Sequence, residues 1–173
     1  MKKLALSTAI LIAFAAPGMA GAEQIQATLI GYEEVPALST PASGQFRAMI
    51  TNHDQFIDYE LTYSGLTGEV RQAHIHFGQH SVNGGIAIWL CGTGDPGTPF
   101  AGPAGTPTCP QEGTVTGTAG MAQVIGPAGQ GIDAGDLEAA LAVIRAGTGY
   151  ANVHSSRFGG GEIRGQIRAS SRP

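Results

Sequence analysis

The alternation of hydrophobic and polar positions along the chain predicts a series of short β-strands. Apolar and polar residues alternate over Gln45–Thr51 and again over Phe56–Tyr63. Alternation with a period of two indicates a strand with one buried face. The turn-forming residues Asn52–Asp54 between these segments predict a β-hairpin. Its second strand is expected to bury Ile57, Tyr59, Leu61 and Tyr63.

Further strands are predicted before and after this hairpin. They are Ile25–Ile30, Val70–Phe77, Ile86–Leu90, Tyr150–Ser155 and Glu162–Arg168. Residues 113–124 are interpreted as one strand or as two short ones. The segment Ile86–Leu90 is almost entirely apolar, which is typical of a strand with both faces buried.

One segment, residues 133–146, has the periodicity of an α-helix. Its apolar stripe consists of Leu137, Ala140, Leu141 and Ile144. We expect Asp133 to cap its N-terminus, with Asp136 in the first turn and Arg145 in the last, before Gly147 ends it. Strands that do not alternate with helices argue against a doubly wound parallel sheet. The predicted fold is therefore all-β, an antiparallel Greek-key sandwich or barrel with this helix as a connection.

The N-terminus has the three parts of a secretory signal peptide. Lys2 and Lys3 precede an apolar run that extends to Ala16 and is too short to span a bilayer, which needs roughly 20 residues. Small residues end the segment, so cleavage is expected after Ala22, or alternatively after Ala20. The prediction is a signal peptide over residues 1–22 and a single domain over residues 23–173. That domain would be secreted or periplasmic and would have no membrane span after cleavage.

Removal of the signal peptide would also remove both lysines of the chain. Seven arginines and thirteen acidic residues would remain, for a net charge near −6. A domain with this charge lacks the basic surface that binds nucleic acid or anionic membranes.

Cys91 and Cys109 flank a segment rich in proline and glycine. Export would place them in an oxidising compartment, which predicts a disulfide bond between them. The alternative is a pair of thiolate metal ligands. The wide spacing argues against it, because thiolate metal sites usually contain closely spaced cysteines.

A group of histidines is the main chemical feature of the sequence. His74 and His76 are two positions apart on a predicted strand, so their imidazoles point to the same side, about 7 Å apart at Cα. His154 lies on another predicted strand and joins them if the two strands are neighbours. His80, in the following polar loop, is a candidate fourth ligand. Neutral imidazoles are ligands for transition metals, here expected to be copper or zinc.

Other interpretations of these polar residues stay open. The histidines could form a hydrogen-bonded polar patch on an exposed strand face, without metal. Glu162 and Arg164 share one strand face, where Glu162 could orient an imidazole and Arg164 could attract an anion, or the two could form only an ion pair. His53 is expected to be solvated in its turn. No nucleophile motif and no phosphate-binding glycine pattern is present, so no catalytic residues are predicted.

Several ordered motifs resemble the CHRD domain, a module first noted in chordin and widespread in bacterial exported proteins. They are Gly31–Pro36, Thr40–Gly44, Tyr63–Leu66, Ala73–Gly78, Asn83–Gly84, Tyr150–His154 and Gly161–Gln166. The resemblance covers about residues 24–168. It implies a β-rich extracellular domain of a family that mostly has no assigned biochemical role.

A weaker similarity is to the copper/zinc superoxide dismutases. It consists of a His-x-His-x-x-Gly stretch, a long loop with a disulfide and a late Val-His strand. It implies copper-type ligation by His74, His76 and His154, but no convincing set of zinc ligands with an Asp follows His80. The leading hypothesis is thus a non-enzymatic exported module that binds copper or zinc. The alternatives are a metal-free structural module with an unknown periplasmic or extracellular protein partner and, least favoured, a dismutase-like enzyme.

Overall fold

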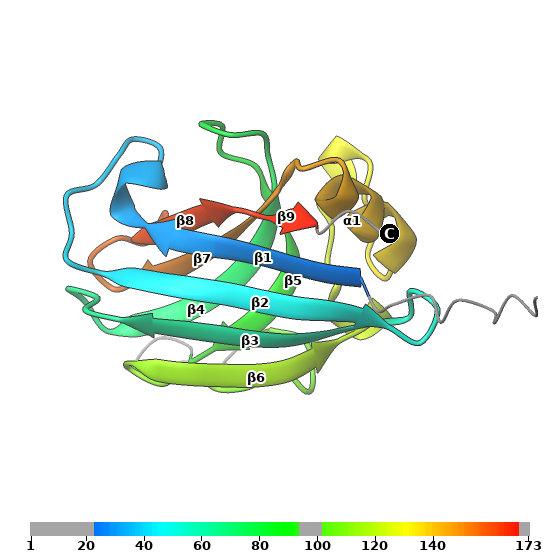
Figure 1. Ribbon diagram of the computed structural model, residues 1–173, viewed down its shortest axis with the longest axis horizontal. Helices are drawn as coiled ribbons and strands as arrows, with labels where there is room; N and C mark the ends of the chain where they lie inside the picture. The colour runs from blue at the N-terminus through cyan, green and yellow to red at the C-terminus, as the bar shows by residue number, and fades with distance from the viewer. Residues whose placement is uncertain (1–22, 94–101, 170–173) are drawn as a thin grey trace, which may run out of the picture.

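The computed structural model describes residues 23–93 and 102–169, so the expected signal peptide lies outside the described residues. Within these ranges the chain forms nine antiparallel strands in a nearly closed barrel, with a single α-helix at one end (Figure 1). The strands are β1 (Glu23–Ile30), β2 (Ser43–Thr51), β3 (Phe56–Ser64), β4 (Val70–Phe77), β5 (Gly85–Gly92), β6 (Gly113–Ala119), β7 (Gly149–Ser155), β8 (Ile163–Gln166) and β9 (Arg168–Ala169). The predicted all-β antiparallel fold is confirmed.

The strand order brings together segments that are distant in the sequence. It runs β5-β4-β7-β8-β1-β2-β3-β6, and β9 pairs with β1. A bridge between Ile88 and Val124 joins β5 to the segment that follows β6, which brings the two ends of the sheet together. In Figure 1, β1, β2, β3 and β6 form the near wall of the barrel, and β4, β5 and β7 lie behind them. Because β7 lies between β4 and β8, the strands that carry the histidines are neighbours.

The core follows the alternation seen in the sequence. The predicted hairpin forms between β2 and β3, where Ile50 pairs with Ile57. Its inward side chains Ile57, Tyr59, Leu61 and Tyr63 are all buried, as expected. The interior of the barrel covers one face of each of these strands and solvent covers the other, so a period of two is sufficient to assign the faces. Residues 113–124 contain one strand, followed by a short 3-10 turn at Met121–Gln123.

The helix begins later than predicted. Helix α1 covers Leu137–Arg145, and Asp136 caps it by accepting a hydrogen bond from the Ala139 amide at 2.9 Å. The prediction that Asp133 caps the helix is therefore wrong. Gly135 has a φ of +84°, a left-handed conformation that a right-handed helix cannot contain. The predicted stripe is confirmed, since Leu137, Ala140, Leu141 and Ile144 are buried. In the described part of the chain, no helix is long and apolar enough to cross a membrane.

Cys91 and Cys109 form a disulfide bond, as predicted. It connects β5 to the segment before β6 and spans 18 positions of the sequence. Both half-cystines are buried in the hydrophobic core. The bond therefore ties the end of β5 to the segment that leads into β6.

Replacing both cysteines by alanine is expected to lower the free energy of unfolding by about 3 kcal/mol, because the unfolded chain loses a cross-link around a loop of this length. Urea unfolding of the oxidised wild-type domain and of the Cys91→Ala/Cys109→Ala variant measures the difference. Equal midpoints and equal slopes for the two proteins would contradict the expectation.

Candidate metal centre

Strands β4 and β7 place three histidines on one side of the sheet. His74 is paired with Asn152, His76 with Tyr150, and Gln72 with His154. The intervening residues Ala73, Ile75 and Val153 point into the hydrophobic core. Because side chains alternate along a strand, the histidines face away from the barrel interior. The convergence expected from the sequence therefore occurs.

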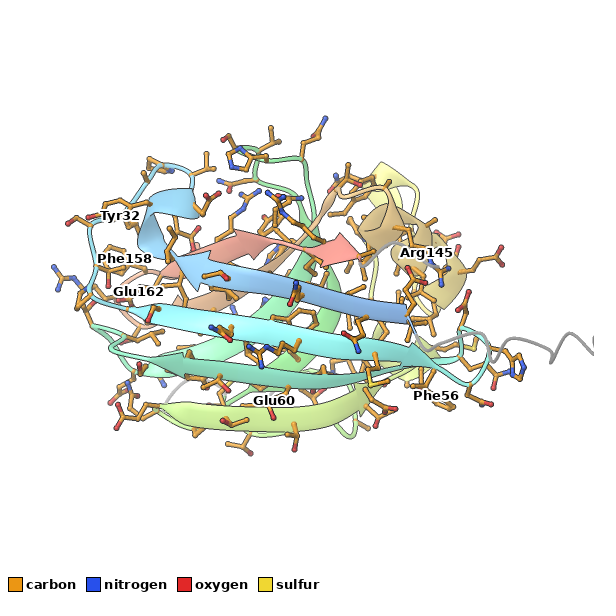
Figure 2. The ribbon with its side chains drawn as sticks, viewed as in Figure 1. Tyr32, Phe56, Glu60, Arg145, Phe158 and Glu162 are labelled. Atoms are coloured by element: carbon orange, nitrogen blue, oxygen red, sulfur yellow. A yellow bond between two sulfur atoms is a disulfide. The ribbon has the colours of Figure 1, made fainter. Side chains whose placement is uncertain are left out.

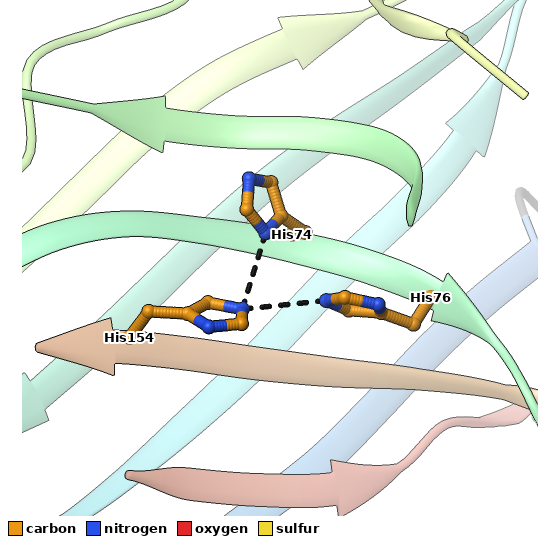
Figure 3. Close-up of side chains that lie close together, drawn as sticks. All are labelled: His74, His76 and His154. Carbon is orange, nitrogen blue, oxygen red and sulfur yellow. Dashed lines mark hydrogen bonds between the residues drawn. The ribbon is translucent and has the colours of Figure 1, made fainter. Parts of the chain in front are cut away.

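The imidazole nitrogens of these residues approach one another closely (Figure 3). His154 Nε2 lies 3.2 Å from His74 Nδ1 and 3.3 Å from His76 Nε2. One ligand atom from each histidine lies within 4.8 Å of the other two. Two nitrogens that bind one ion at 2.0–2.1 Å are about 3.3 Å apart at a tetrahedral angle and about 3.6 Å apart at a trigonal angle. The two contacts lie close to this range, and the third pair of nitrogens is separated by at most 4.8 Å.

The histidines are not on an exposed face, in contrast to one of the interpretations of the sequence. His74, His76 and His154 are 0%, 7% and 4% exposed. Connecting segments cover this side of the sheet, and they are joined to one another where Asn83 donates a hydrogen bond to the carbonyl of Val35. The sequence pattern assigns the strand face correctly but contains no information on the loops that fold over it.

Two backbone carbonyls determine which nitrogens carry protons. His76 Nδ1 lies 3.1 Å from the Gly84 oxygen, and His154 Nδ1 lies 3.0 Å from the Gly159 oxygen. A carbonyl oxygen only accepts, so each Nδ1 must carry a proton and donate it. In a neutral imidazole, Nε2 then has a lone pair and no proton. The contact of 3.3 Å between His76 Nε2 and His154 Nε2 thus brings two lone pairs face to face.

An additional proton does not relieve this contact near neutral pH. Burial, and a smaller contribution from the proximity of His154, lowers the pKa of His76 to about 4, and burial also lowers that of His154 to about 4. The pKa of His74 is lowered as well, by burial and by the two neighbouring imidazoles. All three rings are therefore neutral at pH 7.

His74 completes the group. Its Nδ1 faces His154 Nε2, and its Nε2 is buried with no hydrogen-bond partner among the described residues. The indole of Trp89 packs against the ring in an edge-to-face arrangement, with 4.2 Å between centroids. If His74 carries its proton on Nε2, its Nδ1 is unprotonated. Three unprotonated nitrogens, one from each histidine, then lie around one point. A cation bound there would satisfy all three, so the residues fit a transition-metal ion.

A sequence profile described as the CHRD domain matches residues 25–167, which is nearly the whole chain. The chain belongs to the CHRD family. All three histidines lie within the matched region. Neither the curated proteins nor the solved structures give a significant match.

Two other histidines of this CHRD domain lie outside the cluster. His80, the expected fourth ligand, has a side chain that is 67% exposed and forms an ion pair with Glu33 at 2.8 Å. The structure does not bring it to His74, His76 and His154. His53 lies in the exposed turn between β2 and β3, as the sequence predicts.

Glu162 supports the site without touching an imidazole. Its carboxylate accepts hydrogen bonds from the hydroxyls of Thr40, Thr67 and Ser155, and from the amide of Thr67. These bonds hold its pKa low, although burial acts in the opposite direction. Figure 2 places Glu162 at the end of the barrel opposite to Arg145 on α1. Because Ser155 follows His154 directly, Glu162 fixes the backbone that positions this histidine.

Arg164 forms no ion pair with Glu162 and binds the covering loop instead. It is 2% exposed and donates to the carbonyls of Gln79 and Val82 at 3.0 and 2.9 Å. Its guanidinium lies 3.4 Å above the ring centroid of Tyr150. Tyr150 in turn stacks on His76, with 4.9 Å between centroids and 7° between planes. Arg164 therefore orients His76 from two sides, through the stacked ring and through the loop that ends at Gly84.

Sequence reasoning singled out Glu162 and Arg164 but missed the other groups around the cluster, although each of these lies in a motif of the CHRD resemblance or near one. Asn152 donates a hydrogen bond to the buried carboxyl of Glu34 at 2.9 Å. Burial raises the pKa of Glu34 to about 7. The carbonyls of Gly84 and Gly159 leave no trace in a pattern of side chains. Only the positions of Glu34 and Asn152 within the motifs Gly31–Pro36 and Tyr150–His154 could have indicated the buried pair.

Replacing Gly161 by alanine is expected to lower the free energy of unfolding by about 3 kcal/mol, because a strained backbone and a core clash add. Gly161 has a φ of +125°, and a Cβ there would lie 2.3 Å from Asn152 Oδ1 and 2.7 Å from Glu34 Oε1. Gly159→Ala is the matched control, since a Cβ at Gly159 meets no atom within 4 Å. Thermal unfolding of both variants measures the effect. Equal melting temperatures for the two would refute this explanation.

Proposed function

We propose that this CHRD-domain protein is an exported, non-enzymatic module that binds a transition-metal ion, copper or zinc, through His74, His76 and His154. Export is supported by the charged and apolar pattern of residues 1–22 and by the Cys91–Cys109 disulfide, which suits an oxidising compartment. N-terminal sequencing of the exported protein should then find Glu23 as its first residue.

The observation that carries the metal proposal is the contact between His76 Nε2 and His154 Nε2. A hydrogen-bonded polar patch requires a proton between each pair of nitrogens, and both carbonyl partners exclude one here. Two facing lone pairs in a buried site repel each other, and a positive ion between them converts the repulsion into two coordinate bonds. The bound ion would act as a Lewis acid held by three imidazoles.

The chain's own residues account for the orientation of the ligands. The Gly84 and Gly159 carbonyls fix the tautomers of His76 and His154, a role that outer-shell partners have in most histidine metal sites. Arg164 and Glu162 secure the segments on which these partners lie. The loops then exclude bulk water from the three nitrogens.

A metal titration of residues 23–173 tests the proposal. Zinc and copper are each titrated against a chromophoric competitor, with the wild-type domain and with the His74→Ala/His76→Ala variant. The wild-type domain is expected to take up about one ion per chain and the variant none at the same competitor concentration. Equally weak binding by both proteins would reject the proposal.

A second candidate is a structural or protein-interaction module without metal. It is favoured by the hydrogen bonds that Glu162 and Arg164 make to several separate segments around the cluster. In this case a chelator should leave the melting temperature of the purified protein unchanged. A large decrease on chelation would exclude it, because an ion held only by the folded state adds stability.

A further inference from the structure

We infer that the three-histidine site selects monovalent copper, held by three imidazole nitrogens without a fourth protein ligand. This inference rests on the proposed function and names the ion that the site takes. It follows from three features of the structure, namely the charge of the ligand set, the charge of the surroundings and the number of ligands.

The ligand set carries no charge. Among the described residues, the cluster of potential ligands contains only His74, His76 and His154, with no carboxylate and no thiolate. Both cysteines are bonded to each other, and the buried carboxyls of Glu34 and Glu162 are engaged with Asn152 and with hydroxyl groups. A bound ion therefore keeps its full charge in a buried place. The solvation free energy lost on burial grows with the square of the charge, so a dication is penalised about four times as much as a monocation.

The guanidinium of Arg164 acts in the same direction. Arg164, Tyr150 and His76 form a continuous stack, with the guanidinium 3.4 Å from the first ring and the second ring 4.9 Å further on. The stack brings the permanent positive charge of Arg164 close to the ligand His76. A positive charge at this position repels a bound cation, and it repels a divalent ion twice as strongly as a monovalent one.

The number of ligands agrees with this assignment. Zinc in proteins is almost always four-coordinate and takes a water molecule when the protein supplies three ligands. Here the three ligands are between 0% and 7% exposed, and His80 is turned toward Glu33. Monovalent copper needs no fourth ligand. Enclosure by the loops would also keep the bound ion away from oxidants in the exported compartment.

The test compares affinities of residues 23–173 for two ions under anaerobic conditions. Monovalent copper is competed with bathocuproine disulfonate, and zinc with a chromophoric zinc chelator. Affinity for monovalent copper is expected to exceed that for zinc by at least about a hundred-fold. X-ray absorption of the copper-loaded protein should show three nitrogen neighbours.

Zinc binding that is equal or tighter, or a four-coordinate copper spectrum, would overturn the inference while leaving the proposed metal site intact. Failure to bind either ion would refute the proposed function itself.

A pair of charge variants tests the contribution of Arg164. Arg164→Gln removes the charge and keeps a polar side chain. Arg157→Gln is the control because it makes the same change at an exposed arginine. The first variant is expected to reduce the preference for monovalent copper over zinc by about ten-fold, and the second to leave it unchanged. The same ratio in both variants would show that Arg164 has no such effect. If Arg164→Gln does not fold, the ratio of the copper and zinc affinities of the wild-type domain still tests the selection of monovalent copper.

Discussion

Replacing His154 by alanine is expected to lower the affinity for the bound metal ion by more than about a hundred-fold, because it removes a ligand and not merely an orienting partner. His154 Nε2 is the atom that both other imidazoles approach, at 3.2 and 3.3 Å. The two ligands that remain would not surround an ion. Competition titrations with the wild-type domain and with His154→Ala measure the loss.

His80→Ala is the matched control for this substitution. It makes the same chemical change in an exposed side chain that forms an ion pair with Glu33 outside the cluster. Its metal affinity should equal that of the wild-type domain. If His80→Ala weakens binding as much as His154→Ala does, the ion is bound near the loop and the three-histidine site is wrong. Circular dichroism of both variants verifies that the barrel has formed.

The metal-free domain is expected to lose stability steeply as the pH falls below about 6.5, the pKa of histidine in an unfolded chain. In the folded state His76 and His154 resist protonation down to a pKa of about 4, and the pKa of His74 is also lowered. The unfolded chain therefore binds more protons in this window. Each buried histidine then lowers the free energy of unfolding by about 1.4 kcal/mol per pH unit.

Glu34 offsets part of this loss. Its pKa is raised to about 7 in the folded state, so its carboxyl contributes stability at low pH that is lost as the pH rises toward 7. With three histidines opposed by one carboxyl, the free energy of unfolding is expected to fall by about 3 kcal/mol per pH unit between pH 6 and pH 5.

Urea unfolding at several pH values measures this decrease, and the metal-loaded domain serves as the control. A bound ion occupies the imidazole lone pairs and competes with protons for them. The acid unfolding transition of the metal-loaded domain should therefore move to lower pH. A flat profile for the metal-free domain would refute the assigned burial of the cluster.

Most of the barrel could be predicted because it depends on a repeating local pattern. The inward side chains of β3 alternate with polar residues, and the same periodicity places His74 and His76 on one face. The helix stripe follows from a spacing of three and four residues, but its start does not, because Asp133 and Asp136 are equivalent in a sequence pattern. The conformation of Gly135 decides between them.

The chemistry of the site was only partly predictable, for a physical reason. Convergence of His154 with the other two required β7 to lie beside β4, and the strand order is a property of the whole fold. The protonation of His76 and His154 depends on the carbonyls of Gly84 and Gly159, which no side-chain motif encodes. Burial depends on loops whose lengths are visible in the sequence but whose paths are not. These features convert three histidines on a strand face into facing lone pairs in a closed site.

The central claim is that these lone pairs bind a metal ion, and elemental analysis of the exported protein tests it most directly. The protein is purified from its own compartment without chelators, together with the His74→Ala/His76→Ala variant produced in the same way. We expect roughly one transition-metal ion per wild-type chain and none above background in the variant. Wild-type protein that contains no more metal than the variant would contradict the claim.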